Sequence, residues 1–268
     1  MESYYGQSAQ MLGKHVPPIK IECVTVCVGY ADFLSHTLPL NRGQFDRLIV
    51  ITAPEDKQTV KVCDTYGVRY HRTDSIRSRW GGFHKARGIN EGLQQLEMGG
   101  WVVHMDADII LPSHFRETIA RADLDPTMLY GCDRMECHSY SEWQRYFGNP
   151  EPPIQGNGVF IHTTHAPFRI GTRVQFQDAG GYVPIGFMQL WNPKSSGVKR
   201  YPEDHTTAGK TDSQFAKLWV RRKRGFLPEI IAYHLESEQA EMSVNWSGRK
   251  TKRFHIDDGP LDRFNGGK

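Results

Sequence analysis

The segment "GGWVVHMDADIILPSHF" (residues 99–115) places two carboxylates one residue apart at the end of an apolar run. Residues 101–105 have the composition of a buried strand, whereas Asp106 and Asp108 are costly to bury without a partner. Because alternate residues of an extended chain share a face, both carboxylates can reach one cation. A divalent ion bound by one or two carboxylates completes its coordination with water and phosphate oxygens. The segment therefore predicts either a metal site at a strand end, or a polar strand end in which an aspartate caps a helix.

The residues before this segment alternate between strand and helix patterns. Two runs are apolar and β-branched, as in strands covered on both faces, and residues 86–96 repeat apolar side chains at helical spacing. We expect strands over residues 21–30, 47–52, 68–71 and 101–105, and helices over residues 54–66 and 86–96. This alternation is typical of βαβ units and a parallel sheet. Ligands of such sheets bind beyond the carboxyl ends of the strands, which is where Asp106 and Asp108 lie.

The second half of the chain has a less regular pattern, with loops rich in glycine and proline. We expect strands over residues 128–131, 158–162, 185–191 and 229–234, and a helix over residues 211–222. No internal repeat or linker is evident in the sequence. We therefore expect one α/β domain over residues 21–260, divided near residue 112, with a flexible leader (1–20) and a tail (261–268).

Composition is that of an ordinary globular protein, with 38% hydrophobic and 24% charged residues among 268. The odd number of cysteines, five, favours reduced thiols over a disulfide framework. No apolar run approaches the roughly 18 residues of a membrane span, and no signal peptide is evident, so we expect a cytoplasmic protein. The net charge is only +3, but basic residues gather at 221–224 and 249–253. These clusters indicate either solvated helix ends or a surface for a polyanionic acceptor.

With its context, the aspartate segment resembles the GT-A-fold, nucleotide-sugar-dependent glycosyltransferases, especially the family-2-like group. The resemblance covers roughly residues 20–235. It is carried by "VTVCVGYADFL" (24–34), "LIVITAPED" (48–56), "FHKARGINEGL" (83–93), "VVHMDADIILP" (102–112), "GKTDSQFAKLW" (209–219) and "IIAYHLE" (230–236). It implies a GT-A, Rossmann-like fold with a mixed, mainly parallel central sheet flanked by helices. It also implies a nucleotide-sugar donor, with a UDP-sugar favoured.

The resemblance implies roles for particular residues of the donor site. The nucleoside would be held by Val28, Gly29, Tyr30, Thr52 and Asp74. Asp106, Ala107 and Asp108 would hold the diphosphate through Mn²⁺ or Mg²⁺, and Lys85 could reach the phosphates. His234 matches a histidine that completes the metal shell, which favours Mn²⁺ because imidazole suits transition metals. Taken alone, His234 would be an ordinary half-buried histidine.

Sugar transfer also needs a base for the acceptor hydroxyl. In inverting members of the family a carboxylate that opens a helix does this, and Asp212 matches it. The alternative is structural: Thr211 with Gln214 forms a capping box, and an acid stabilises the first turn without catalysis. The family often has Glu-Asp where this chain has Thr-Asp, which leaves inversion open. Glu203 and Asp204 are the second choices for the base.

Two further predictions concern the substrates. Residues 185–191 are expected to line the acceptor side, with Gln189 as a sugar contact and Trp191 as a stacking surface. Residues 80–82 are expected to form a mobile loop near the donor. The acceptor is left open between a hydroxylated nucleic-acid base, which would have to be flipped out of a duplex, and a soluble saccharide or protein hydroxyl.

Three other classes of protein fit parts of the pattern. A haloacid dehalogenase-type phosphatase also carries D-x-D after an apolar strand, but near the N-terminus and with Thr or Val where this chain has Ile110. A sugar-phosphate nucleotidyltransferase should show a glycine- and arginine-rich loop after the first strand, where this chain reads "VGYADFLSH" (28–36). A non-catalytic nucleotide-sugar-binding module could keep the fold, although the retained carboxylates and His234 argue against it.

Overall fold

The computed structural model describes residues 18–77, 82–137, 181–204 and 208–235, with shorter pieces at 140, 143, 163–165, 168–171, 174–176 and 253–254. Short 3₁₀ helices are labelled η. The first part contains β1 (Ile21–Val26), α1 (Ala31–Asn41), η1 (Arg42–Gln44), β2 (Arg47–Thr52), α2 (Lys57–Tyr66), β3 (Arg69–Arg72), α3 (Lys85–Leu93), β4 (Trp101–Met105), β5 (Ile109–Ile110) and α4 (Phe115–Arg121). The second contains β6 (Leu129–Cys137), β7 (Thr163–His165), β8 (Phe168–Gly171), β9 (Val174–Phe176), β10 (Gly181–Val183), β11 (Met188–Trp191), α6 (Pro193–Ser196), η2 (Ala208–Lys210), α7 (Thr211–Ala216), η3 (Arg221–Lys223) and β12 (Arg224–Leu235).

The main sheet has the strand order β3-β2-β1-β4-β11-β6-β12-β5. Strands β3, β2, β1 and β4 are all parallel, and β12 is parallel to β6. Strand β11 is antiparallel to both β4 and β6, so β4, β6 and β12 run in one direction. The predicted mixed, mainly parallel sheet flanked by helices is therefore confirmed. Its direction defines two edges, an N-terminal edge where these strands begin and a C-terminal edge where they end.

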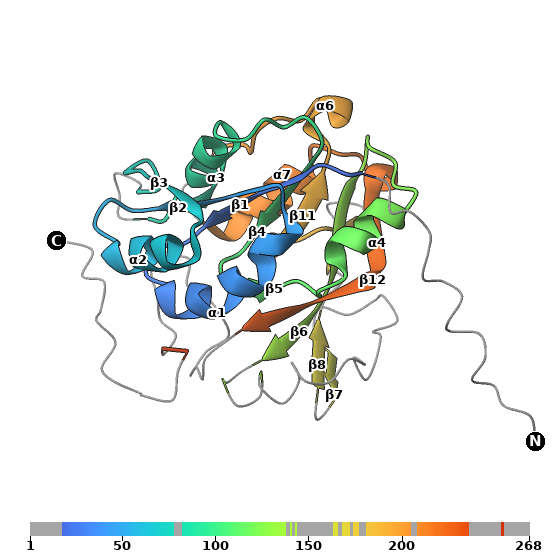
Figure 1. Cartoon of the computed structure of the whole chain (residues 1–268). Coiled ribbons are helices and arrows are strands. Elements are labelled where there is room, and N and C mark those ends of the chain that lie inside the picture. The colour runs from blue at the N-terminus through green and yellow to red at the C-terminus, as the bar shows by residue number, and fades with distance from the viewer. Residues whose placement is uncertain are drawn as a thin grey trace, which may run out of the picture.

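Helices cover both faces of the sheet (Figure 1). Successive residues of β4 point to opposite faces, with Val103 packed among residues of α1, α2 and α4, and Val102 packed among residues of α3 and α7. Helix α3 approaches the sheet closely, because a Cβ atom at Gly92 would come within 2.3 Å of a Val24 methyl group. A side chain here would push the helix away. The glycine therefore helps to set the height of α3 above β1 and β2.

In the parallel half of the sheet the predicted elements are all present, but the first strand is shorter than predicted: β1 ends at Val26, and residues 27–30, predicted as strand, form a loop. Strand β2 covers the residues predicted for it, and α2 ends at Tyr66, with Gly67 in the left-handed conformation (φ 63°) that favours glycine. Asp56 caps the start of α2 by accepting a hydrogen bond from the Thr59 N–H. Helix α1 was not predicted, and its pattern is interrupted by Pro39.

In the second half the predictions locate elements but misjudge their extent. Strand β6 continues to Cys137, and β12 is twelve residues long with a register shift between Leu227 and Ile231. Pro228 lies within that shift. A proline has no N–H to donate to a neighbouring strand, so it fits where the regular pairing is interrupted. The helix predicted over 211–222 is wrong in length: α7 ends at Ala216. The strand predicted over 158–162 lies outside the described residues.

The five cysteines, all of them described, are buried thiols that form no disulfide. Burial raises the pKa of the Cys63 thiol to about 12 and that of Cys23 still further. The prediction of reduced thiols is confirmed, and these two are unreactive at neutral pH because the thiolate is the reactive form. Within the described parts of the chain, none of the helices has the length and apolarity needed to cross a bilayer.

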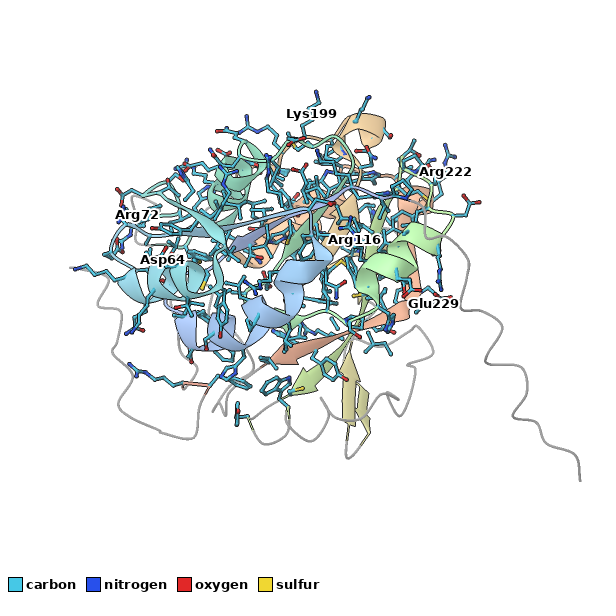
Figure 2. The ribbon with its side chains drawn as sticks, viewed as in Figure 1. Asp64, Arg72, Arg116, Lys199, Arg222 and Glu229 are labelled. Carbon is cyan, nitrogen blue, oxygen red and sulfur yellow. The ribbon has the colours of Figure 1, made fainter. Side chains whose placement is uncertain are left out.

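Charged side chains such as Arg72, Lys199 and Arg222 lie at the periphery of the molecule (Figure 2). The basic run 221–224 is only partly available to a partner. Lys223 binds Asp125 (2.8 Å), and the Arg224 guanidinium donates to backbone carbonyls that include that of Ala216. Half of the run therefore stabilises the fold. The second basic cluster lies mostly outside the described residues.

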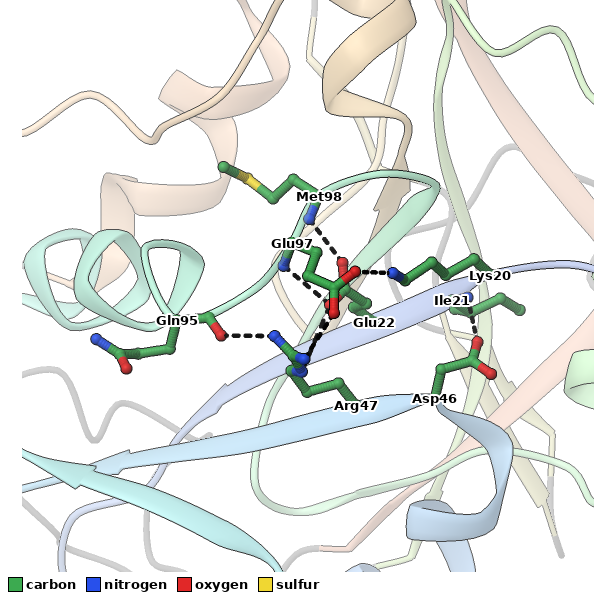
Figure 3. Close-up of polar contacts among 8 residues, drawn as sticks. All are labelled: Lys20, Ile21, Glu22, Asp46, Arg47, Gln95, Glu97 and Met98. Carbon is green, nitrogen blue, oxygen red and sulfur yellow. Dashed lines mark hydrogen bonds and ion pairs between the residues drawn. The ribbon is translucent and has the colours of Figure 1, made fainter.

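The N-terminal edge of the sheet carries a charge network centred on Glu22, which we call the Glu22 network (Figure 3). The Glu22 side chain is fully buried and accepts hydrogen bonds from the backbone N–H groups of Glu97 (3.0 Å) and Met98 (2.7 Å). Met98 has a φ of 51°, a conformation uncommon outside glycine, in the turn that these bonds hold. Arg47 and Lys20 form ion pairs with the Glu97 carboxylate. Each charge in the network thus faces an opposite charge or a backbone donor.

Candidate active site

The two aspartates lie on the turn between β4 and β5, at the C-terminal edge of the sheet. The Asp106 N–H donates to the Phe187 carbonyl (3.1 Å) just before β11, and the Asp108 carbonyl accepts from the Leu235 N–H (2.8 Å) at the end of β12. The turn is therefore held on both sides by strands that come from the second half of the chain. This position beyond the strand ends is the one predicted from the sequence.

Each aspartate is paired with a side chain from another element. Lys85, the first residue of α3, forms an ion pair with Asp106. The His234 Nε2 atom, near the end of β12, lies 3.5 Å from the Asp108 Oδ2 atom. The other oxygen of Asp108, Oδ1, is buried and has no hydrogen-bond partner among the described residues. The structure thus brings together four residues that the sequence analysis placed at the diphosphate.

Burial and neighbouring opposite charges act against each other on the pKa values of these groups. Burial raises the pKa of Asp106, and Lys85 opposes this only in part. For Asp108 burial acts in the same direction, but the proximity of His234 outweighs it and leaves the pKa below its usual value. Burial disfavours the Lys85 ammonium, yet Asp106 more than compensates and raises its pKa. Lys85 is therefore a cation at neutral pH.

These residues suit a divalent metal ion chemically, although they are not arranged as a finished metal site. Carboxylate oxygens are ligands of Mg²⁺ and Mn²⁺, and a histidine suits Mn²⁺. The unpartnered buried oxygen of Asp108 is what such an ion would satisfy. Among the residues that the structure describes, however, no three His, Cys, Asp or Glu side chains already surround one point. A metal ion would therefore have to draw the ligands together and displace Lys85 from Asp106.

Asp212 lies in the first turn of α7 and belongs to the same electrostatic cluster, because its charge helps to raise the pKa of Lys85. Its carboxylate accepts hydrogen bonds from the backbone N–H groups of Gly186 (2.8 Å) and Ser213 (2.9 Å). The capping box predicted as the alternative is wrong. Lys210 holds the N-cap position without a side-chain cap, and Thr211 is buried inside the helix.

The residues expected at the nucleoside differ in their accessibility. Val28, Gly29 and Tyr30 are half-buried in the loop after β1, and Asp74 is exposed in the loop after β3. Thr52 is fully buried, and its hydroxyl donates to the Asp56 carboxylate (3.2 Å). The Thr52 side chain therefore stabilises the loops from within.

Asp56 is a residue that the sequence analysis missed as part of this region. Its carboxylate accepts from the Gly29 N–H (2.8 Å) and from the Thr59 hydroxyl (2.7 Å), in addition to Thr52. It thereby ties the loop after β1 to the end of β2 and the start of α2. Its place at a helix start directly after a strand was a local signal, but the bond to Gly29 joins residues far apart in the sequence.

Two residues predicted to face the acceptor belong to the core instead. Gln189 is fully buried, donating to the Pro184 carbonyl (2.7 Å) and accepting from the Tyr201 hydroxyl (2.6 Å). Trp191 is also fully buried, packed against Tyr201 and Phe215. Neither can contact a sugar without rearrangement. The loop predicted over 80–82 lies almost wholly outside the described residues.

Glu203, a second choice for the base, has a structural role. It accepts hydrogen bonds from Asn90 (2.6 Å) and from Arg200 (2.7 Å), and Arg87 lies 3.7 Å from its other oxygen. These contacts hold the segment after α6 against α3. Asp204 follows it and is exposed.

No protein-family model matches the sequence, and no curated protein matches it. Solved structures do match. Mannosyl-3-phosphoglycerate synthase from Rubrobacter xylanophilus is 16% identical, with 46% of this chain and 42% of that chain covered and a TM-score of 0.34. Glucosyl-3-phosphoglycerate synthase from Mycobacterium tuberculosis, in complex with Mn²⁺, UDP and glucosyl-3-phosphoglycerate, is 17% identical, with 43% and 44% covered and a TM-score of 0.31. A 4-diphosphocytidyl-2C-methyl-D-erythritol synthase is 14% identical, with 83% and 91% covered and a TM-score of 0.43.

The first two matches are to phosphoglycerate synthases. The match spans less than half the length of either synthase. Such low identities, with TM-scores below 0.5, assign no activity. The function has to be inferred from the side chains of this chain.

Proposed function

We propose that the protein is a metal-dependent glycosyltransferase that uses a nucleoside diphosphate sugar, with a UDP-sugar favoured. The observation that carries the proposal is the pair Asp106 and Asp108 at the C-terminal edge, where a buried oxygen of Asp108 has no partner among the described residues. A carboxylate oxygen left in this state costs free energy, and it is typical of groups that await a ligand. Lys85 beside the pair adds a cation that suits a diphosphate.

In the proposed site Asp106, Asp108 and His234 would hold Mn²⁺ or Mg²⁺. Bound there, the ion would act as a Lewis acid on the departing diphosphate. Lys85 would neutralise part of the phosphate charge. The loop of Val28, Gly29 and Tyr30, together with Asp74 from the loop after β3, would bind the nucleoside. Asp56 keeps that loop in place from within.

We propose Asp212 as the base that takes the proton from the acceptor hydroxyl, with inversion at the sugar. Its two backbone hydrogen bonds orient the carboxylate and use one lone pair on each oxygen. A carboxylate has about four such sites, so each oxygen keeps one for a proton. The acceptor in this proposal is a hydroxyl group, for which a saccharide is the first candidate to test.

Calorimetric titration with UDP, GDP, CDP and TDP, each with and without Mn²⁺, tests the donor site. We expect one diphosphate to bind only with the metal, and Asp108→Asn to lower that affinity by about 100-fold, or roughly 2.7 kcal/mol. Asp204→Asn is the matched control, because it removes a carboxylate outside the metal cluster. If none of the four diphosphates binds to the wild-type chain in a metal-dependent way, the proposal is overturned.

A transfer assay separates this function from that of a nucleotidyltransferase. Release of UDP from a UDP-sugar in the presence of an acceptor is the expected result. Release of pyrophosphate from a nucleoside triphosphate and a sugar 1-phosphate would contradict it. The loop after β1, residues 27–30, has one glycine and no arginine, which agrees with the first outcome.

A further inference from the structure

Lys85 occupies the place at Asp106 that a metal ion would need. Its ammonium group forms an ion pair with the Asp106 Oδ1 atom, and this is the one ion pair that it makes with described residues. The side chain of Asp106 is 29% exposed and that of Lys85 is 14% exposed, so the pair is partly accessible to solvent. A cation and a metal ion cannot share the same carboxylate oxygen without repulsion.

We propose that Lys85 is a resident counter-ion that the metal displaces from Asp106, and that the displaced ammonium then binds the diphosphate. Metal and diphosphate would consequently bind cooperatively. This inference rests on the proposed function, since it concerns the same ligands. The exchange of Lys85 would make the binding of metal and of diphosphate depend on each other, in addition to any bonds between the metal and the phosphates.

The charges of the site support such an exchange. Asp106, Asp108 and Asp212 bring three carboxylates into the cluster, and their charges all act on Lys85. When a metal ion alone enters, it must compete with Lys85, and the released ammonium then lies beside a second cation. When a diphosphate enters with the metal, the ammonium gains an anionic partner in place of Asp106. Each ligand therefore removes a cost that opposes the other.

The position of Lys85 also permits the movement. It is the first residue of α3, whose N-terminal end favours anions. A lysine side chain has four rotatable carbon–carbon bonds and presents a compact charge, so its ammonium can change partner without backbone motion. Helix α3 itself is held close to the sheet at Gly92. The helix can thus stay fixed while the side chain swings.

Arg87 provides a matched control on the same helix. Its side chain is 46% exposed, and its guanidinium lies 3.7 Å from Glu203 rather than near the two aspartates. Arg87→Gln therefore removes one positive charge from α3 without removing the counter-ion of Asp106. Any effect of net charge alone should appear in this variant as well.

The experiment measures the affinity for Mn²⁺ alone, for UDP alone, and for each at saturation of the other, by calorimetry. In the wild type we expect each ligand to strengthen the other by about tenfold or more, within the usual range of coupling between sites. Lys85→Met should bind Mn²⁺ alone several-fold more tightly than the wild type, bind UDP more weakly, and show less coupling. Asp106→Asn releases Lys85 permanently, so it should bind UDP without metal several-fold more tightly than the wild type. Arg87→Gln should match the wild type in its affinity for Mn²⁺ alone.

Two results would overturn the exchange. One is a Lys85→Met chain that binds Mn²⁺ no more tightly than the wild type. The other is an Asp106→Asn chain whose metal-free affinity for UDP is unchanged. If either variant is poorly folded by circular dichroism, the other one decides the question. Failure of the proposed function has a different signature, because the wild type itself would then show no metal-dependent diphosphate binding.

Discussion

The two edges of the sheet both bury carboxylates, but they treat them in opposite ways. At the N-terminal edge, Glu22 accepts two backbone hydrogen bonds and faces Arg47, whose Nε atom is 3.9 Å away. At the C-terminal edge, the charge of Asp108 helps to raise the pKa of Asp106, and one Asp108 oxygen has no partner among the described residues. Carboxylates thus stabilise the fold at the N-terminal edge, whereas at the C-terminal edge a carboxylate oxygen is still available to bind a ligand.

This difference gives a criterion for reading buried acids. A carboxylate that is buried and accepts backbone hydrogen bonds is part of the architecture, and Asp56 fits this description as well as Glu22. Asp212 also accepts two backbone hydrogen bonds, but it is only half-buried. A carboxylate with a buried oxygen that has no partner among the described residues, such as Asp108, is incompletely satisfied. Functional groups are often kept in such a state at some cost to stability. Variants at the N-terminal edge should accordingly lower the stability of the fold, whereas variants at the C-terminal edge should lower the affinity for ligands.

The largest effect is expected at the N-terminal edge. Glu22→Ala leaves the buried N–H groups of Glu97 and Met98 without an acceptor, so the free energy of unfolding should fall by about 3 kcal/mol. Chemical denaturation measures this change. Glu97→Gln is the control: its side chain is 53% exposed, so solvent screens its ion pairs and the loss of stability should be much smaller than for Glu22→Ala. A loss below about 1 kcal/mol for Glu22→Ala would erase the distinction between the two edges.

An effect of similar size should appear at the C-terminal edge only when ligands are present. At concentrations near 100 times its dissociation constant, UDP with Mn²⁺ should stabilise the wild type by about 2.7 kcal/mol. Asp108→Asn should lose this stabilisation, while its own stability without ligand stays within about 1 kcal/mol of the wild type, because the amide has the same shape. Thermal unfolding with and without ligands measures both quantities. A ligand-free Asp108→Asn chain that is as unstable as Glu22→Ala would show that Asp108 is structural.

The smallest effect concerns another ion pair at the N-terminal edge, between Asp125 and Lys223, and depends on pH. Hydrogen bonds from Lys223 and Thr127 lower the pKa of Asp125 from 3.8 to about 2. The ionised carboxylate therefore stabilises the fold above about pH 4, and this contribution is lost as the pH falls through 2. Asp125→Asn should lower the urea midpoint slightly at pH 6 but not near pH 2. A difference that persists unchanged at pH 2 would show that the charge of Asp125 is not its cause.

The parallel half of the fold could be predicted because its signals are local. Apolar β-branched runs mark β1, β2 and β4, and Gly67 marks the end of α2. The positions of Asp106, Asp108, Lys85 and His234 followed from the family resemblance, and the structure brings these four side chains together. Whether they bind a metal ion and a diphosphate is still a prediction.

The errors arise where distant segments decide the environment of a residue. Gln189 and Trp191 were placed at the acceptor because polar and aromatic side chains are common at sugar sites. The structure buries both, because Tyr201 from a later loop supplies a hydroxyl for Gln189 and a ring for Trp191. Thr211 was predicted to cap the helix, but it is the first residue of α7 and its side chain is buried. Spacing along the chain contains no information about such tertiary contacts.

The strand order has a consequence for how the protein acquires its activity. Strands β1, β2 and β3 pair with their neighbours in sequence, so the loops for the nucleoside can form early. His234 instead lies on β12, which pairs with β5 and β6 far earlier in the chain. Long-range pairings of this kind are slow to form. Metal-dependent ligand binding should therefore be the last property to return during refolding, which would make it a direct report on the docking of the final strand.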